Sequence, residues 1–222
     1  GRGGLGNHNF ATSRHQAPRH AQPGEPGDEG HYLFELRLVA DIGLVGYPNA
    51  GKSTLLNAIS HARPKIAAYP FTTLHPQIGV VEMDGWERYT VCDIPGIIEG
   101  AHEGKGLGHQ FLRHIERTRT LALVIPVDAA DVQVEYEALR SELEAYSSEL
   151  SVTPHCVMLT KTDLLPPDES LPELDAPDAW GVFGISSVAQ KGLDELLQQL
   201  WRESREAGAG ETPDPDEGWW SP

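Results

Sequence analysis

The chain has 222 residues, enough for one α/β domain with a sizeable core and some length to spare. Its formal net charge of −16 and its isoelectric point near 4.9 argue against broad, charge-driven binding of this segment to nucleic acid or anionic membrane, although docking on RNA through a local patch or a missing domain stays open. No run approaches the ~18 apolar residues of a membrane span and no secretory signal is visible, so we expect a cytoplasmic location, and we expect a monomer.

The first 30 residues are rich in Gly, Pro, Asn, Gln and His, and they show little apolar periodicity. Alone they would not bury a core. They are either a flexible tail or the end of a domain that begins before Gly1, and the absence of an initial Met indicates a fragment or a processed chain. The two cysteines, Cys92 and Cys156, lie in apolar runs, so we expect buried, reduced thiols and not a disulfide.

The stretch 46–53, GYPNAGKS, matches G-x-x-x-x-G-K-[ST], with an apolar strand pattern before it and a helical pattern after it. In such a phosphate loop, backbone N–H groups form a nest for phosphate oxygens, and the following helix adds its positive dipole end. Lys52 is predicted to reach the β- and γ-phosphates and Ser53 to bind Mg²⁺. A glycine-rich turn without function is the simpler alternative. The predicted phosphate-binding residues are Gly46, Tyr47, Pro48, Asn49, Ala50, Gly51, Lys52 and Ser53.

Downstream, apolar runs that read as strands alternate with helical patterns, which predicts a mainly parallel α/β sheet with the phosphate loop at the carboxyl end of a strand. A loop with two prolines comes first, and an acidic, proline-rich surface loop comes later. From Gly208 onward the chain is predicted to be a disordered acidic tail. In chain order we expect a loop at 63–74, a hairpin of strands 77–83 and 87–92, a helix at 109–120, a strand at 121–127, a helix at 132–150, a strand at 155–159, a loop at 164–178, a strand at 180–185 and a helix at 192–205.

Two further stretches carry candidate Mg²⁺ ligands. Thr72 and Thr73 follow Lys52 by about twenty positions, where a loop threonine of a nucleotide triphosphatase can bind Mg²⁺ and sense the γ-phosphate. Asp93 ends an apolar strand, and a carboxylate there can hold Mg²⁺, usually through water. Gly96, three residues on, can donate its N–H to the γ-phosphate. Each of these could also be an ordinary loop or turn residue.

Two strand ends could recognise a base. Thr160, Lys161, Thr162 and Asp163 follow the strand 155–159, and an aspartate there can accept hydrogen bonds from the N1–H and N2–H₂ groups of guanine, which adenine lacks. Lys161 would lay its methylene stem over the base. The next strand is followed by Ser186, Ser187 and Val188, whose backbone N–H groups could contact the guanine oxygen.

Taken in order, GYPNAGKS, YPFTT, DIPGIIEGAHEGKGLGHQFLRHIERT, TKTD and SSV resemble the Obg family of GTPases, and residues 1–30 resemble the end of that family's glycine-rich domain. The resemblance covers residues 1–205. It implies a P-loop three-layer α/β sandwich preceded by a short remnant of the glycine-rich domain. It also implies Mg²⁺-dependent GTP hydrolysis, a role in assembly of the large ribosomal subunit and in stress response, and a link to ppGpp. The implied domains are 1–39, the end of the glycine-rich domain with a linker; 40–207, the GTPase domain; and 208–222, the acidic tail.

The resemblance also assigns roles by position. Ser53, Thr73 and Asp93 hold Mg²⁺, and Lys52, Thr73, Gly96 and Asn49 act in catalysis. Segments 160–163 and 186–188 hold the base. The first switch is formed by Phe71, Thr72, Thr73, Leu74 and His75, and the second opens with Asp93, Ile94, Pro95 and Gly96.

The sequence departs from the family where the base motif begins. The family has Asn there, which links the base loop to the phosphate loop, and this chain has the shorter Thr160. We expect weaker or faster-exchanging nucleotide with guanine preference kept by Asp163. After Gly96 comes Ile97 where many GTPases have a water-orienting Gln nearby, so hydrolysis is expected to be slow without a partner. Asn49 either helps hold a stimulating K⁺ or only braces the loop.

Arg113, Arg117 and Arg119 are predicted on or just beyond the helix after the second switch, where a solvated face is favoured over contact with RNA.

Two other functions stay open for the whole chain. One is an ATP-using relative, which Asp163 disfavours, and the other is a sensor that reports GTP, GDP or ppGpp with incidental turnover.

Overall fold

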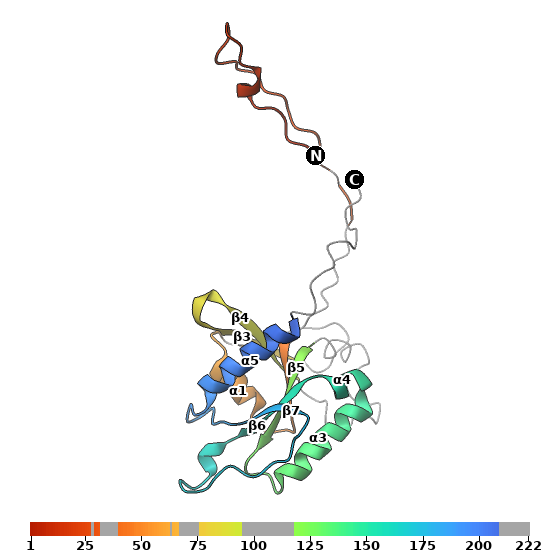
Figure 1. Cartoon of the computed structure of the whole chain (residues 1–222), viewed down its shortest axis with the longest axis vertical. Helices are drawn as coiled ribbons and strands as arrows, with labels where there is room; N and C mark the ends of the chain where they lie inside the picture. The colour runs from red at the N-terminus through yellow and green to blue at the C-terminus, as the bar shows by residue number, and fades with distance from the viewer. Residues whose placement is uncertain (28, 32–39, 63, 67–75, 95–117, 209–222) are drawn as a thin grey trace. The chain divides into compact units, whose positions relative to one another are not determined.

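A computed structural model describes residues 1–27, 29–31, 40–62, 64–66, 76–94 and 118–208 (Figure 1). The chain divides into two compact units, Gly1–Leu36 and Arg37–Pro222. Within the described part of the chain, none of the helices has the length and apolar character needed to cross a lipid bilayer.

The first unit is a chain segment that folds back on itself. Backbone hydrogen bonds join Gln22 to Leu5 and Glu25 to Arg2, each at 2.9 Å. Glycine makes this close approach possible, because a Cβ on Gly4 would lie 1.9 Å from the Gln22 carbonyl oxygen. A single 3₁₀ turn, η1 (Asn7–Phe10), lies at the far end.

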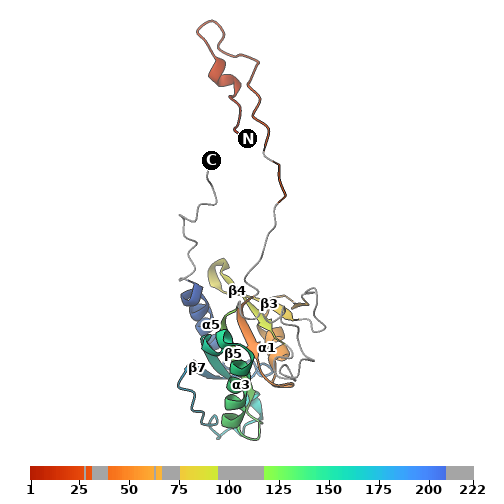
Figure 2. The ribbon, with the colours of Figure 1, turned by 90° about the vertical axis from the view of Figure 1, so that its right-hand side faces the viewer.

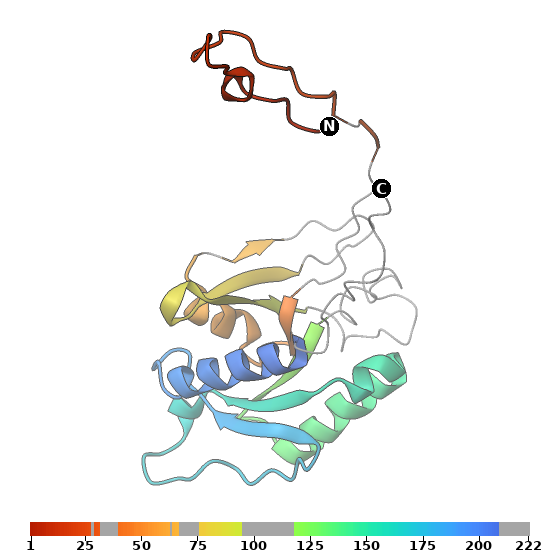
Figure 3. The same cartoon turned by 45° about the horizontal axis from the view of Figure 1, so that its top comes forward.

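The second unit is built around a seven-stranded sheet in the order β2-β3-β4-β1-β5-β6-β7. The pairs from β4 to β7 are parallel, and β2 and β3 add an antiparallel edge; Figure 3 shows the yellow β3–β4 hairpin as part of one side of the sheet. The mainly parallel α/β sheet predicted from the sequence is thereby confirmed. The elements are β1 (Ala40–Val45), α1 (Lys52–Ile59), β2 (Lys65–Ile66), β3 (Gln77–Glu82), η2 (Asp84–Trp86), β4 (Arg88–Asp93), β5 (Thr118–Pro126), α3 (Val132–Tyr146), α4 (Ser148–Val152), β6 (His155–Thr160), η4 (Thr162–Leu164), β7 (Ala179–Gly184) and α5 (Leu193–Gly208).

Helices cover both faces of the sheet, which gives three layers (Figure 2). The apolar run of β5 explains how one strand serves two cores. Leu121, Leu123 and Ile125 pack into the cluster that includes α3 and α4, whereas Ala122 and Val124 pack into the cluster that includes α1 and α5. All five side chains are fully buried. A continuous apolar run is therefore the pattern expected for a central parallel strand.

Most predicted elements differ from the observed ones by one to three residues at an end, and two of the differences change the extent of a helix. The helix predicted at 109–120 is wrong for its last three residues, because β5 begins at Thr118 and pairs Thr118 with Ala40. The helix predicted at 132–150 is broken at Ser147, whose extended backbone and hydroxyl, which accepts from the Glu149 N–H at 3.2 Å, begin a second short helix.

Smaller differences concern the loop 63–74 and the cysteines. Lys65 and Ile66 form a two-residue strand against β3, although this stretch was predicted to be a loop throughout. Cys92 and Cys156 are buried free thiols, as predicted, and burial raises the pKa of Cys92 to about 12. The predicted tail at 208–222 lies outside the described residues except for Gly208, which ends α5.

Candidate nucleotide-binding site

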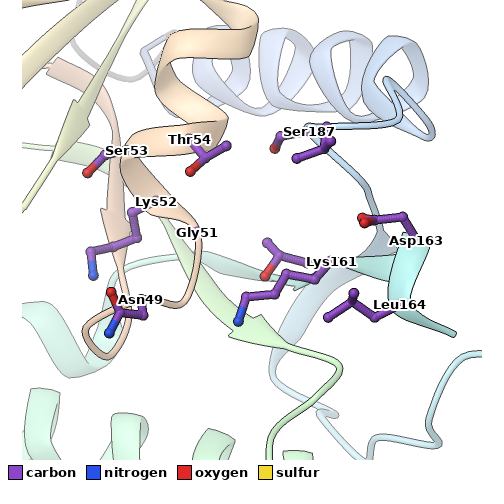
Figure 4. Close-up of a pocket in the computed structure, with 11 residues that line it drawn as sticks. Asn49, Gly51, Lys52, Ser53, Thr54, Lys161, Asp163, Leu164 and Ser187 are labelled. Carbon is purple, nitrogen blue, oxygen red and sulfur yellow. The ribbon is translucent and has the colours of Figure 1, made fainter.

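A cavity of ≈ 420 Å³ opens between the phosphate loop and the loops that follow β6 and β7 (Figure 4). Because β1, β6 and β7 run in the same direction, their carboxyl ends meet at one edge of the sheet, which is where α/β folds place ligands. The lining residues are Asn49, Gly51, Lys52, Ser53, Thr54, Thr160, Lys161, Asp163, Leu164, Ser187 and Val188.

The phosphate loop has the backbone that an anion-binding loop needs. Asn49 and Gly51 have φ angles of 61° and 101°, in the left-handed region. Gly46 is required by packing, because a Cβ there would lie 2.4 Å from the carbonyl oxygen of Val124 in β5. The Lys52 amino group donates hydrogen bonds to the carbonyl oxygens of Gly46 at 2.6 Å and Tyr47 at 3.0 Å. This lysine therefore lies folded against its own loop.

Ser53 and Asp93 meet beside this loop. The Ser53 hydroxyl donates to Asp93 Oδ2 at 2.5 Å, and Asp93 is only 4% exposed at the end of β4. Among the residues that the structure describes, the other carboxylate oxygen, Oδ1, is buried and has no hydrogen-bond partner. A buried carboxylate oxygen without a partner is costly. A hydroxyl and a carboxylate at this spacing are oxygen ligands that suit a hard cation such as Mg²⁺.

Thr160 joins the base loop to the phosphate loop. Its hydroxyl donates to the Ala50 carbonyl oxygen at 2.6 Å, and Thr160 is 2% exposed. The shorter side chain thus reaches the phosphate loop, which is the link that the resemblance expects of Asn at this position. Whether nucleotide exchanges faster in this chain stays a prediction.

Asp163 and Ser186 connect the loops that follow β6 and β7. The Ser186 hydroxyl donates to Asp163 Oδ1 at 2.5 Å and accepts from the Ala189 N–H at 2.9 Å. The backbone N–H of Ser186 donates to the Lys191 carbonyl oxygen at 3.0 Å, and Ser186 is fully buried. Of the three residues expected to contact a base through their N–H groups, only Ser187 and Val188 line the cavity. Figure 4 shows the Asp163 carboxylate pointing toward the cavity.

Lys161 lies along the cavity with a left-handed backbone, at φ 60°. Its amino group donates to both oxygens of Asp128, at 3.0 Å and 3.1 Å. Sequence reasoning missed Asp128, which does not line the cavity. Its position two residues after β5 could have indicated it, because the other site residues also follow the carboxyl ends of strands in this sheet. It also missed Thr54 and Leu164, which do line the cavity.

The remaining predicted residues fall into two groups. Tyr47, Pro48 and Ala50 belong to the phosphate loop without lining the cavity, Ile94 is buried at the end of β4, and Thr162 donates its N–H to the Ile185 carbonyl oxygen. Both switches lie largely outside the described residues, as do Arg113 and Arg117; the undescribed site residues are Phe71, Thr72, Thr73, Leu74, His75, Pro95 and Gly96.

Arg119, predicted on or just beyond a helix, lies in strand β5, half-buried, and donates to Asp41 Oδ1 at 3.0 Å. The interpretation of this residue as part of a solvated helix face is therefore wrong. Its place in the strand follows from the earlier start of β5.

Comparison with solved structures supports the fold. The G domain of the T. maritima FeoB iron transporter matches with a TM-score of 0.52 at 20% identity, covering 73% of this chain and 97% of that chain. A mutant of S. thermophilus NFeoB bound to GDP matches with a TM-score of 0.55 at 18% identity, covering 75% of this chain and 63% of that chain. At these identities the likeness shows the fold alone.

Comparison with protein families and curated proteins finds relatives with much higher sequence identity. The GTPase Obg of Chlorobium chlorochromatii (strain CaD3) is 55% identical over 202 residues, which are 91% of this chain and 59% of that protein. The GTPase Obg of Salinibacter ruber (strain DSM 13855 / M31) is 54% identical over 206 residues, which are 90% of this chain and 61% of that protein. The chain thus spans about three fifths of the length of these relatives. The GTP1/OBG family model matches residues 1–38, and the model described as 50S ribosome-binding GTPase matches residues 41–161, more than half of the chain. The chain therefore belongs to the 50S ribosome-binding GTPase family, with GTPases named Obg among its relatives.

Proposed function

We propose that this chain is a Mg²⁺-dependent GTPase that cleaves the bond between the β- and γ-phosphates of GTP, giving GDP and phosphate. The observation that carries the proposal is one cavity lined at one end by Lys52 and Ser53 and at the other by Asp163. A guanine nucleotide needs both ends. The phosphate loop supplies N–H groups and a lysine for the phosphates, and a carboxylate supplies acceptors for the guanine edge.

The base end supports guanine over adenine. Asp163 can accept hydrogen bonds from the N1–H and N2–H₂ groups of guanine, and adenine offers no such donor pair. The Lys161 stem lines the same cavity and can cover the base plane. Accordingly, an ATP-using enzyme is not favoured. We assign the base to Thr160, Lys161, Thr162, Asp163, Ser186, Ser187 and Val188, with Thr160 and Ser186 acting through Ala50 and Asp163.

We assign Mg²⁺ to Ser53 and Asp93, with Thr73 as a third ligand by resemblance. The residues fit, because Asp93 Oδ1 is buried and, among the described residues, lacks a hydrogen-bond partner, while the Ser53 hydroxyl already points to the same carboxylate. When bound, Mg²⁺ would neutralise charge on the β- and γ-phosphate oxygens. In this assignment Lys52 leaves the carbonyl oxygens of Gly46 and Tyr47 to contact the phosphates.

We propose that hydrolysis is slow without a partner and stimulated by K⁺. Ile97, close after Gly96, cannot orient a water molecule by hydrogen bonding. Asn49 lines the cavity from a left-handed position in the phosphate loop, from which its side-chain oxygen could help hold K⁺ near the phosphates. Turnover is measured in K⁺ and in Na⁺ at matched ionic strength, with Asn49→Ala as the control variant. Equal rates in both salts would refute K⁺ stimulation.

The decisive experiment compares affinity and single-turnover hydrolysis of GTP and ATP, with and without Mg²⁺. We expect GTP to bind and turn over slowly, and removal of Mg²⁺ by EDTA to stop turnover. Equal binding of ATP would revive the ATP-using alternative. Addition of large ribosomal subunits distinguishes a ribosome-linked GTPase, which they accelerate, from a sensor of GTP, GDP or ppGpp, whose incidental turnover they leave unchanged.

We further propose the biological setting from the family. The family model is described as 50S ribosome-binding, which supports the large ribosomal subunit as partner and a cytoplasmic site of action. Residues 1–39 are assigned to the end of a glycine-rich domain with a linker, since the GTP1/OBG model matches 1–38. We assign residues 40–207 to the GTPase domain and 208–222 to an acidic tail, and we propose a monomer. Copurification of the chain with 50S subunits in the presence of GTP tests the partner.

A further inference from the structure

Asp128 and Lys161 leave neighbouring strand ends and meet outside the cavity. Asp128 follows β5 and Lys161 follows β6, and the two strands are parallel with Pro126 opposite Thr160. The Lys161 amino group contacts Oδ1 and Oδ2 of Asp128 at 3.0 Å and 3.1 Å. Both side chains are partly exposed, at 47% for Asp128 and 32% for Lys161, so the pair is formed at the rim of the site and not in the core.

This pair fixes the direction of a side chain that would otherwise have several rotamers. Lys161 lines the cavity, whereas Asp128 does not. Figure 4 shows Lys161 extended between the phosphate loop at Asn49 and Leu164, with its amino group away from Asp163. A lysine stem that must cover a base loses rotamer freedom when the base binds, and a fixed amino group removes part of that loss before binding.

A second carboxylate is close to the same pair. Burial and the negative charge of Asp128 raise the pKa of Glu135, and the positive charge of Lys161 lowers it. Lys161 thus has two acidic neighbours, and the structure places its amino group on Asp128. Neutralising Asp128 would leave Lys161 beside the charge of Glu135 on α3 and without its ion pair to Asp128.

We propose that Asp128 is a positioning residue for nucleotide binding, which orients Lys161 over the base without touching the nucleotide. The proposal rests on the proposed function, because it needs a guanine nucleotide in the cavity. It predicts that Asp128 affects the base end of the site and leaves the phosphate end unchanged.

The test measures dissociation of a fluorescent GDP and binding of inorganic tripolyphosphate, which occupies only the phosphate loop. Asp128→Asn is expected to release GDP about two- to fivefold faster, the range for a partly exposed ion pair, with tripolyphosphate affinity unchanged. Asp168→Asn is the matched control, because it removes the same charge from an exposed loop that does not line the cavity, and it should leave both measurements unchanged. Thermal unfolding of both variants confirms that they are folded.

A double-variant cycle decides whether Asp128 acts through Lys161. Lys161→Met keeps an unbranched stem and removes the charge, so Asp128→Asn should have no further effect in that background. Three results would each overturn the positioning role. In the first, Asp128→Asn still speeds GDP release in the Lys161→Met background; in the second, Asp128→Asn loses tripolyphosphate binding. In the third, Asp128→Asn and the wild type release GDP at the same rate. If the wild-type chain binds tripolyphosphate but no GDP, the proposed guanine site itself fails, which is a different result from any of these.

Discussion

The Thr160 hydroxyl donates a hydrogen bond to the Ala50 carbonyl oxygen at 2.6 Å, joining two loops that are 110 residues apart in the sequence. Both residues are almost fully buried, with exposures of 2% and 1%. The phosphate loop and the end of β6 are therefore linked by a neutral hydrogen bond that is shielded from water. Movement of one loop relative to the other would break this bond and leave a buried carbonyl oxygen unpaired.

Replacement of Thr160 by Val tests the importance of this link. Val has nearly the same shape but lacks the hydroxyl, so the Ala50 carbonyl oxygen loses its partner inside the protein. We expect the free energy of unfolding to fall by about 1–3 kcal/mol and GDP affinity to fall about tenfold. Chemical denaturation and fluorescence titration with GDP measure the two effects.

Thr160→Ser is the matched control, because it keeps the hydroxyl and removes only a methyl group. Its GDP affinity should stay close to that of the wild type. If Val and Ser variants bind GDP equally well, the hydroxyl link contributes nothing to the site.

From the sequence we could predict those parts of the candidate site that depend on one short segment. The phosphate loop was identified by its glycines and GKS ending, and Asp93 by its position at a strand end. The partners of these residues were harder to predict. Ala50 contacts Thr160 through a backbone oxygen, which any residue type would supply. Asp128 is one carboxylate among many in an acidic chain, and only the register of β5 and β6 brings it to Lys161.

The same distinction applies to the fold. The central strands could be predicted because a short, continuous apolar run between helical patterns is typical of a parallel strand that is buried on both faces. The start of β5 could not, because Thr118, Arg119 and Thr120 are polar and their strand conformation depends on partners distant in sequence. Thr120 donates to the Pro154 carbonyl oxygen at 2.8 Å, and Arg119 pairs with Asp41. Tertiary contacts therefore decide the boundary.

The Arg119–Asp41 pair should stabilise the end of the sheet opposite the cavity. Asp41 Oδ2 accepts from the N–H and the hydroxyl of Thr90, at 2.7 Å and 2.8 Å, and its Oδ1 accepts from Arg119 at 3.0 Å. The side chains of Arg119 and Asp41 are 25% and 15% exposed. Arg119→Met would leave a partly buried carboxylate without its counter-charge, so we expect a loss of about 1–3 kcal/mol in unfolding free energy.

Arg205→Met provides the comparison, since Arg205 pairs with Glu87 at the same distance of 3.0 Å but with 62% and 44% exposure. Its pair and its contact with the Trp201 ring should together contribute less than about 1 kcal/mol. Denaturant unfolding of both variants measures the difference. Equal losses would show that burial does not set the strength of these pairs.

His155 should make stability depend on pH. Burial, assisted by the positive charge of Arg140 and opposed by Asp178, lowers the pKa of His155 to about 4, and its ring nitrogen lies 3.1 Å from the Tyr136 hydroxyl. The unfolded chain takes up this proton near pH 6.5, so between about pH 6.5 and pH 4 it binds more protons than the folded chain. The contribution is fully present above pH 6.5 and is lost as the pH falls toward 4, amounting to roughly 3 kcal/mol.

His155→Gln isolates this contribution, because an amide can still hydrogen-bond to Tyr136 and does not titrate. Unfolding free energies of the two proteins are measured from pH 8 to pH 4. The difference between the curves should be constant above about pH 6.5 and should shift in favour of the variant at lower pH. Parallel curves over the whole range would contradict the assignment.

Replacement of Asp163 by Asn should change the base that the site accepts. Asp163 keeps one oxygen bonded to the Ser186 hydroxyl at 2.5 Å, and its carboxylate accepts from the guanine edge in the proposed complex. An amide has one acceptor and two donors, so we expect GTP affinity to fall about 10- to 100-fold, the range for loss of a charge-assisted hydrogen bond. Xanthosine triphosphate has a carbonyl where guanine has its amino group, and the amide can donate to it, so its affinity should rise. Titration with GTP, ATP and xanthosine triphosphate measures the change.

Ser186→Ala is the control, because it removes one hydrogen bond to Asp163. It should weaken the binding of GTP without strengthening the binding of xanthosine triphosphate. Unchanged preference for GTP in the Asn variant would mean that Asp163 does not contact the base.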